Sequence, residues 1–230
     1  ERHEAWGSLA RKLAHEIKNP LTPIQLTIDR LKNKYSTELD EKNKENFKEN
    51  LKIINNQIKQ IEKLVNEFSD FARMPKPVFQ KNDLIILIKD SIKLLQQLDQ
   101  NIKIEFIHNY QKLYLDGDKE QLSRVFLNLI KNSIESIHQK AEKVSDFNKN
   151  ISIEVSDFDS HIDIVINDNG IGFNNLNNNI KEILNPYFTT KKEGTGLGLS
   201  IVNKIINDHN GNIEFKSKTD GAIVKITFIK

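Results

Sequence analysis

His15 stands in the run His15-Glu16-Ile17-Lys18-Asn19-Pro20, where several neighbouring residue types could support chemistry. The apolar spacing around it is helical and puts His15 on the face opposite the apolar stripe, toward solvent. Glu16 can orient an imidazole nitrogen or accept its proton, and Asn19, one turn further on, can hold a water on the same face. Pro20 removes a backbone hydrogen bond and favours a bend beside the histidine. His15 is therefore a candidate reactive residue, although a lone histidine in such a place is more often an ordinary surface residue.

Two asparagines, Asn128 and Asn132, lie four residues apart in another helical pattern, so their side chains share one face. Amides at the edge of an apolar stripe can cap a helix or bond to loops. They can also hold Mg²⁺ and the triphosphate that it carries, because Mg²⁺ prefers oxygen ligands and keeps several waters. Both interpretations stay open on this spacing alone.

Two glycine-rich segments follow. Asp168-Asn169-Gly170-Ile171-Gly172 comes directly after a predicted strand, where Asp and Gly usually form a turn. Gly194-Thr195-Gly196-Leu197-Gly198-Leu199 comes directly before a predicted helix. Glycines there allow backbone N–H groups to approach an anion at the helix N-terminus, but the spacing is not that of the G-x-x-x-x-G-K-[ST] phosphate loop.

The composition excludes several classes of protein. The 230 residues include 34 basic and 32 acidic side chains, a net charge of +2 that argues against a dedicated nucleic-acid binder. The sequence has no cysteine, which excludes disulfides and thiolate metal sites. It contains no apolar run near the roughly 20 residues that cross a bilayer. Because it starts at Glu1 rather than Met, we expect a fragment whose upstream part could include membrane spans.

Two long helical patterns must position His15. Apolar or small residues recur at steps of three and four over two stretches: Trp6, Ala10, Leu13, Ile17, Pro20, Ile24, Thr27 and Leu31, and then Phe47, Leu51, Ile54, Ile58, Ile61, Val65, Phe68 and Ala72. The polar residues 33–46 are predicted to connect them. Stripes of this length cannot be buried on each other alone, so we expect a dimeric four-helix bundle. The alternative is a single hairpin packed on the rest of the chain.

Met74-Pro75-Lys76-Pro77 is expected to end the helical part. Mixed elements are predicted beyond it, with helices at 83–98, 118–139 and 197–209, the first capped by Asp83. Strands are predicted at 102–107, 113–115, 151–155, 162–166, 213–215 and 223–228. We expect the helices to gather on one face of a mostly antiparallel sheet. The Asn-rich residues 174–179 are predicted to form a mobile loop.

Taken in this order, the four segments resemble the H, N, G1 and G2 boxes in the catalytic core of sensor histidine kinases. Pro186-Tyr187-Phe188-Thr189-Thr190-Lys191 resembles the F box of that family. The stretch from Ala14 to Leu26, AHEIKNPLTPIQL, is especially similar to nitrogen-regulation sensor kinases of the NtrY type. The resemblance covers almost the whole chain.

The resemblance implies an α+β protein of two domains. Residues 1–75 would form the dimerisation and histidine phosphotransfer domain, a helical hairpin that pairs into a dimeric four-helix bundle. Residues 76–230 would form the catalytic ATP-binding domain, an α/β sandwich of the Bergerat type. By the matching motif, His15 would be the phospho-acceptor and Glu16 its partner base. Asn19 would position the hydrolytic water of the reverse, phosphatase reaction.

The resemblance also assigns the ATP site. Asn132 would be the Mg²⁺ ligand, Asn128 a second contact of the N box, and Asp168 the group that binds the adenine amino group. The glycines would shape that side of the pocket (Gly170 and Gly172) or cradle the phosphates (Gly194, Gly196 and Gly198). The sequence departs from the family pattern at Ser133, where alanine is common, and in a glycine box reduced to Asp220-Gly221-Ala222.

The implied function is ATP-dependent autophosphorylation of a histidine and phosphotransfer to an aspartate of a response regulator receiver domain, with ATP and Mg²⁺ as cofactors. The implied setting is the cytoplasmic portion of a membrane-anchored sensor kinase that acts as a homodimer and binds no nucleic acid. Two alternatives stay open. One is a Bergerat-type ATPase without kinase activity, and the other is a docking and phosphatase module for the regulator with weak kinase activity.

Overall fold

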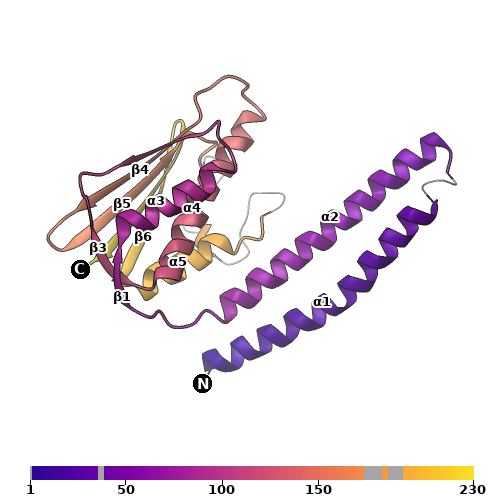
Figure 1. Ribbon diagram of the computed structural model, residues 1–230, viewed down its shortest axis with the longest axis horizontal. Coiled ribbons are helices and arrows are strands. Elements are labelled where there is room, and N and C mark those ends of the chain that lie inside the picture. The colour runs from indigo at the N-terminus through magenta and orange to yellow at the C-terminus, as the bar shows by residue number, and fades with distance from the viewer. Residues whose placement is uncertain (1, 36–38, 174–182, 186–193) are drawn as a thin grey trace. The chain divides into compact units, whose positions relative to one another are not determined.

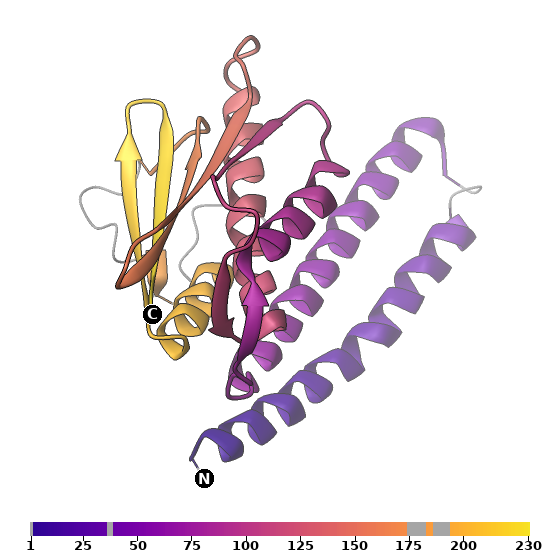
Figure 2. The ribbon, with the colours of Figure 1, turned by 60° about the vertical axis from the view of Figure 1, so that its left-hand side comes forward.

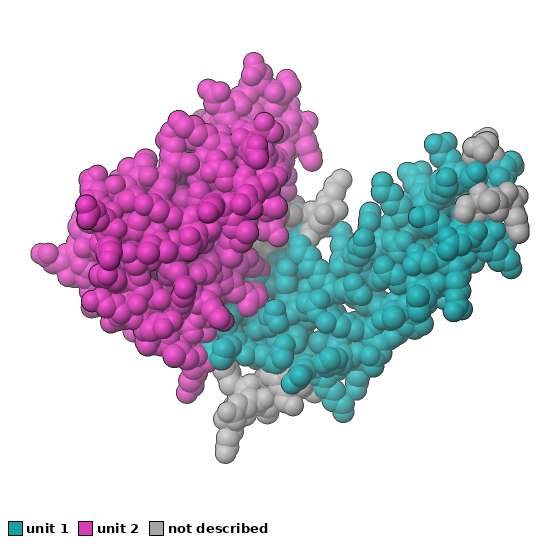
Figure 3. Space-filling model, viewed as in Figure 1, with its two compact units in different colours: residues 1–75, 189–197 teal, residues 76–188, 198–230 magenta. Residues whose placement is uncertain are grey.

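The computed structural model describes residues 2–35, 39–173, 183–185 and 194–230. The chain divides into two compact units, which Figure 3 distinguishes by colour: unit 1 contains residues 1–75 and 189–197, and unit 2 contains residues 76–188 and 198–230. The predicted mobile loop at 174–179 and the F box at 186–191 lie outside the described residues.

Unit 1 is built on a helical hairpin of α1 (Arg2–Tyr35) and α2 (Glu41–Ala72) (Figure 1). Helix α1 continues through Pro20 and Pro23. The predicted connection at 33–46 is wrong in extent, because helix occupies both of its ends. The carboxylate of Asp40 caps α2 by accepting a hydrogen bond from the Asn43 backbone N–H (2.8 Å). This cap starts a polar helical turn that the apolar period could not reveal.

Only some of the apolar side chains that the structure describes in the hairpin are buried within the chain. The buried ones recur mainly every seven residues: Ala10, Ala14, Leu21 and Ile28 on α1, and Leu51, Ile58 and Val65 on α2. Others of the predicted stripes stay 40–45% exposed: Leu13, Ile17, Ile24, Ile54 and Ile61. On α1 the buried row is thus offset from the predicted stripe, and among the described residues each helix keeps a second apolar row that stays partly exposed.

Unit 2 opens with a two-stranded antiparallel ribbon of β1 (Gln80–Asp83) and β3 (Tyr114–Gly117). Strand β1 was not predicted, since its sequence QKND has no apolar alternation. Its pairing with β3 is reinforced by Asn82, whose amide donates to the Gly117 carbonyl at 2.8 Å. Asp83 then caps α3 (Leu84–Gln96) by accepting from the Ile85 N–H at 3.1 Å, which confirms the predicted cap.

A five-stranded sheet forms one layer of unit 2, and helices form the second layer. Its strands are β2 (Lys103–Ile107), β4 (Asn150–Asp157), β5 (His161–Asp168), β6 (Gly211–Lys218) and β7 (Gly221–Ile229). Their order is β2-β4-β5-β7-β6, and every pair is antiparallel except β2 with β4. Helices α3, α4 (Lys119–Ala141) and α5 (Gly198–Asp208) cover one face (Figure 2). The predicted mixed fold, with helices on one face of a mostly antiparallel sheet, is confirmed.

The core of unit 2 lies between α4 and the inward face of the sheet. Alternate residues of β5, such as Ile162 and Ile164, are fully buried, as is Leu122 of α4. Between these isoleucines Asp163 points to the other face, where it accepts from the Thr227 hydroxyl (2.7 Å) and the Lys225 ammonium (2.9 Å). Burial opposes ionisation of Asp163, but these two bonds outweigh it and hold its pKa below the ordinary value.

Candidate functional site

His15 lies in the middle of α1 and is exposed to solvent, as the helical register predicts. Ala14 beside it belongs to the buried row, whereas the imidazole of His15 is open to solvent. Glu16 and Asn19 are exposed as well. A reagent in solvent can therefore reach the imidazole of His15, and Glu16 and Asn19 are accessible beside it.

Asp168, at the end of β5, is the opposite case, because its side chain is buried (5% exposed). Its carboxylate accepts a hydrogen bond from the Gly170 N–H at 2.9 Å, and further bonds from the Ser133 hydroxyl and the Ala222 N–H. Burial raises the pKa of Asp168 above its ordinary value, although these bonds and the charge of Lys218 act in the other direction. A buried acceptor of this kind suits a ligand with a donor group.

The loop after Asp168 requires its glycines. A Cβ at Gly170 would lie 2.6 Å from the Ser136 backbone carbon, closer than real Cβ contacts allow. Gly172 has φ +67° and Gly221, on the adjoining β6–β7 turn, has φ +107°, both in the region that favours glycine. A Cβ at Gly221 would lie 2.7 Å from the Asn169 Cα. The loop and the turn therefore pack backbone against backbone beside Asp168.

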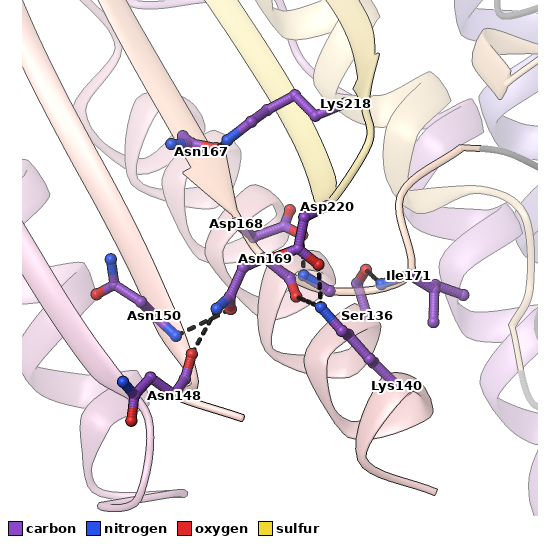
Figure 4. Close-up of polar contacts among 11 residues, drawn as sticks. Ser136, Lys140, Asn148, Asn150, Asn167, Asp168, Asn169, Ile171, Lys218 and Asp220 are labelled. Atoms are coloured by element: carbon purple, nitrogen blue, oxygen red, sulfur yellow. Dashed lines mark hydrogen bonds and ion pairs between the residues drawn. The ribbon is translucent and has the colours of Figure 1, made fainter. Parts of the chain in front are cut away.

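Polar contacts from α4 fix the same loop (Figure 4). The Lys140 ammonium donates to the Asn169 carbonyl (2.8 Å) and pairs with the Asp220 carboxylate. The Ser136 hydroxyl accepts from the Ile171 N–H at 3.1 Å. Sequence reasoning assigned no role to Ser133, Ser136 or Lys140. Helical spacing was a signal for Ser136 and Lys140, since steps of four put them on the face of α4 that carries Asn132, and Ser133 was noted only as a departure from the family pattern.

The two predicted amides lie one turn apart on α4, and both are half-buried. The Asn128 amide nitrogen donates to the Arg124 carbonyl (2.9 Å), and its Oδ1 lies 3.4 Å from where a Cβ at Gly198 would be. Asn128 thus adjoins the first residue of α5, where helical N–H groups favour anions. Amide oxygens fit Mg²⁺. The described residues contain no group of three His, Cys, Asp or Glu that could hold a metal, so an ion here would need phosphate ligands too.

The last glycine-rich segment is divided between the two units. Gly198 begins α5 in unit 2, whereas Gly194 and Gly196 belong to the segment grouped with unit 1. Gly196 has φ +70°, and the Leu197 N–H bonds to the Thr195 hydroxyl at 3.4 Å. Within unit 2 the structure brings together Asp168, Gly170 and Gly172 in one loop and Asn128 with Gly198 at another point.

Comparison with known families decides the identity. Residues 5–77 match the His Kinase A (phospho-acceptor) domain, and residues 117–230 match the histidine kinase-, DNA gyrase B- and HSP90-like ATPases. The chain is a histidine kinase core. In it, His15 falls within the region matched by the phospho-acceptor domain, and Asn128, Asp168 and the glycines fall within the region matched by the ATPase family.

The relatives of this histidine kinase core include NtrY-like kinases, as its sequence predicts. It is 37% identical over 229 residues to an NtrY-like sensor histidine kinase of Rickettsia prowazekii, covering 99% of this chain and 37% of that protein. It is 35% identical to the nitrogen regulation protein NtrY of Azorhizobium caulinodans, covering 99% of this chain and 29% of that one. The chain therefore spans about a third of the length of these relatives.

Solved structures of histidine kinases share the fold. Kinase ThkA, crystallised in complex with the response regulator TrrA, aligns with all of this chain and 63% of its own, with a TM-score of 0.67 and 27% identity. The catalytic domain of ThkA aligns with 66% of this chain and 96% of its own, with a TM-score of 0.58 and 28% identity. Across the residues that the structure describes, none of the helices has both the length and the apolar character needed to span a membrane.

Proposed function

We propose that this core uses ATP to phosphorylate His15 and then passes the phosphoryl group to an aspartate of a response regulator receiver domain. The observation that carries the proposal is the exposed His15 in the middle of a helix, inside the region that matches phospho-acceptor domains. The relative ThkA, crystallised with a response regulator, supports the choice of partner. We also propose the cytoplasmic portion of a membrane-anchored sensor as the setting, as expected for an NtrY-like kinase.

The chemistry at His15 needs a neutral imidazole nitrogen as the nucleophile. In the proposed step this nitrogen bonds to the γ-phosphorus, the bond to the bridging oxygen breaks, and ADP leaves with its electron pair. Glu16 is the proposed partner base, which holds the other ring nitrogen and takes up its proton. Because phosphoryl transfer depends mostly on positioning, a histidine fixed in mid-helix is a suitable acceptor.

The proposed ATP-binding domain is residues 76–230. Asp168 would accept a hydrogen bond from the adenine amino group, and its loop would hold the base with Gly170 and Gly172. Asn132 is the proposed Mg²⁺ ligand and Asn128 a second contact. When bound, Mg²⁺ would neutralise triphosphate charge. The phosphates would lie against backbone N–H groups at Gly194, Gly196 and Gly198.

Residues 1–75 are the proposed dimerisation and phosphotransfer domain. The exposed row of Ile17, Ile24, Ile54 and Ile61 supports this role, since a second copy would bury it in a four-helix bundle. Each isoleucine would gain roughly 1.5–3 kcal/mol if it passed from full exposure to full burial, and correspondingly less from its half-exposed state.

The fate of the γ-phosphate tests the kinase proposal. The purified chain is incubated with Mg²⁺ and γ-labelled ATP. A kinase retains label on the protein that is labile to acid and stable to alkali, and it loses this label when a cognate receiver domain is added. Release of free phosphate with no label on the protein would instead indicate a Bergerat-type ATPase and reject the proposal.

A phosphatase reaction is the second candidate, because Asn19 is exposed one turn after His15. An amide there can direct a water at an aspartyl phosphate of a bound regulator. We expect Asn19→Ala to spare autophosphorylation and to slow dephosphorylation of the receiver domain, while the matched variant Asn56→Ala, on the exposed surface of α2, changes neither rate. An unchanged dephosphorylation rate in Asn19→Ala would reject the water-positioning role.

A further inference from the structure

The side of α1 that carries His15 borders a hollow of about 230 Å³ between the two helices of the hairpin. Arg11, His15 and Lys18 line it from α1, and Ser69, Asp70 and Arg73 line it from the end of α2. Helical spacing explains why Arg11, His15 and Lys18 line the same hollow, because residues four before and three after His15 lie on the same face of a helix.

The charge of this hollow is unbalanced. Among the described residues that line it, three are cationic (Arg11, Lys18 and Arg73) and one, Asp70, is a carboxylate. Asp70 lies 3.6 Å from a guanidinium nitrogen of Arg73, and the Arg73 Nε donates to the Ser69 carbonyl at 3.3 Å. An excess of two positive charges therefore surrounds an imidazole that can carry a phosphoryl group.

We propose that this hollow is the binding site of the phosphoryl group once His15 carries it, with Arg11, Lys18 and Arg73 holding its oxygens. Guanidinium and ammonium groups are the side chains that proteins use to bind phosphate. The inference rests on the proposed role of His15 as acceptor. It adds a role for Arg11, Lys18 and Arg73, which would retain the phosphoryl group on His15 between its formation and its transfer.

The same charges slow the loss of the phosphoryl group to water. In hydrolysis a water oxygen bonds to phosphorus, the P–N electron pair returns to the imidazole, and the imidazole takes up a proton as inorganic phosphate leaves. Nearby cations disfavour that protonation, and they hold the phosphoryl oxygens in place. Removing one cation should therefore shorten the lifetime of phosphohistidine.

Chemical phosphorylation tests the site without using ATP. Potassium phosphoramidate transfers its phosphoryl group to imidazole as its own P–N bond breaks and ammonia leaves. The full chain and its variants are treated with phosphoramidate, the reagent is removed, and decay of the phosphohistidine is followed by ³¹P NMR and intact mass. His15→Gln gives the background, and Arg30→Gln, an exposed arginine on the same helix, is the matched control.

We expect Arg11→Gln and Arg73→Gln each to shorten the half-life by up to about fivefold, the upper range for a single solvent-exposed charge contact. Arg73→Lys should restore most of the loss, and Arg30→Gln should change nothing. Higher salt should shorten the half-life of the wild type more than that of the variants. Circular dichroism checks that each variant keeps its helices.

Equal half-lives in the wild type, Arg11→Gln and Arg73→Gln would overturn the inference, because Arg73 would then serve only to close the end of α2. Modification of His15 no greater than the His15→Gln background would also overturn it, since a cationic hollow should attract the anionic donor. Failure of the proposed kinase function is a separate result. It would appear as no label from ATP in a chain that phosphoramidate still modifies at His15.

Discussion

The helical hairpin and the α/β unit differ in how completely they bury their apolar residues. In the α/β unit, Phe126 of α4 and Ile164 of β5 are at most 1% exposed, and helices cover one face of the sheet. In the hairpin, one apolar row is buried and a second row, including Ile54 and Ile61, stays 40–44% exposed. The α/β unit therefore contains its own core, whereas the hairpin has a face that another surface must cover.

The candidate functional groups of the two units also differ in exposure. His15 is exposed on α1, while Asp168 is buried and held by bonds from Gly170, Ser133 and Ala222. A nucleophile that must meet a nucleotide and then a receiver domain has to be accessible. A group that recognises a base has to be enclosed, because water would otherwise compete for its hydrogen bonds. The exposed His15 therefore suits the proposed transfer of a phosphoryl group, and the enclosed Asp168 suits the proposed binding of a nucleotide.

Two isoleucines one turn apart on α2 give the strongest test of this comparison. Ile58 is 4% exposed within the hairpin, and Ile61 is 40% exposed. Ile58→Asp should destabilise the hairpin by about 3–5 kcal/mol, as expected for an unpaired buried charge. We expect circular dichroism to show loss of helix in this variant while the α/β unit stays folded.

Ile61→Asp should keep the helices but prevent dimer formation, which sedimentation measures. Glu62→Gln, beside it on α2, serves as a control that leaves the assembly unchanged. A wild-type chain that stays monomeric at micromolar concentration, or an Ile61→Asp variant that dimerises as well as wild type, would contradict the idea that a second copy covers this face.

The enclosed site of the α/β unit is tested by Asp168→Asn. This change should weaken ATP binding about 10- to 100-fold, since a hydrogen bond to a charged group contributes about 1.5–3 kcal/mol. Calorimetry with the full chain measures the affinity, and Asp163→Asn, on the other face of β5, is the matched control. Undiminished binding in Asp168→Asn would argue against its role in recognising adenine.

A smaller expected effect is the dependence of stability on pH through Asp168. Because burial raises the pKa of Asp168, the folded chain binds a proton at this group more readily than the unfolded chain does. The contribution of Asp168 to stability is therefore fully present below its unfolded pKa of about 3.8 and is lost as pH rises through the raised folded pKa. Urea unfolding without nucleotide should show Asp168→Asn gaining stability relative to wild type across that interval. A constant difference would mean that burial does not control this group.

Local signals in the sequence predicted much of the α/β unit. Asp83 is a helix cap whose side chain bonds to the nearby backbone, and alternation in β4 and β5 reflects burial on one face. Strand β1 could not be predicted in this way, because its polar residues pair only through β3, some 30 residues further along the chain. The buried row on α1 differs from the predicted stripe because Ala14, Leu21 and Ile28, which lie outside that stripe, are buried in the hairpin.

Local sequence signals likewise predicted only part of the candidate functional sites. The spacing of His15 and Asn19, and the glycines after Asp168, could be recognised as motifs because each belongs to one local segment. The supporting contacts from Ser133 and Lys140 join helix α4 to a loop about 30 residues away, so they depend on tertiary structure. The cationic hollow beside His15 likewise needs Arg73 from the far end of α2.

The most direct test of the central claim is mapping of the phosphorylated residue after incubation of the full chain with ATP and Mg²⁺. The account predicts a single phosphoryl group on His15, seen by intact mass and located by peptide fragmentation at neutral pH. It also predicts complete loss of this group in His15→Gln and no loss in His138→Gln, an exposed histidine of the α/β unit. Phosphorylation that persists in His15→Gln would contradict the assignment of the acceptor.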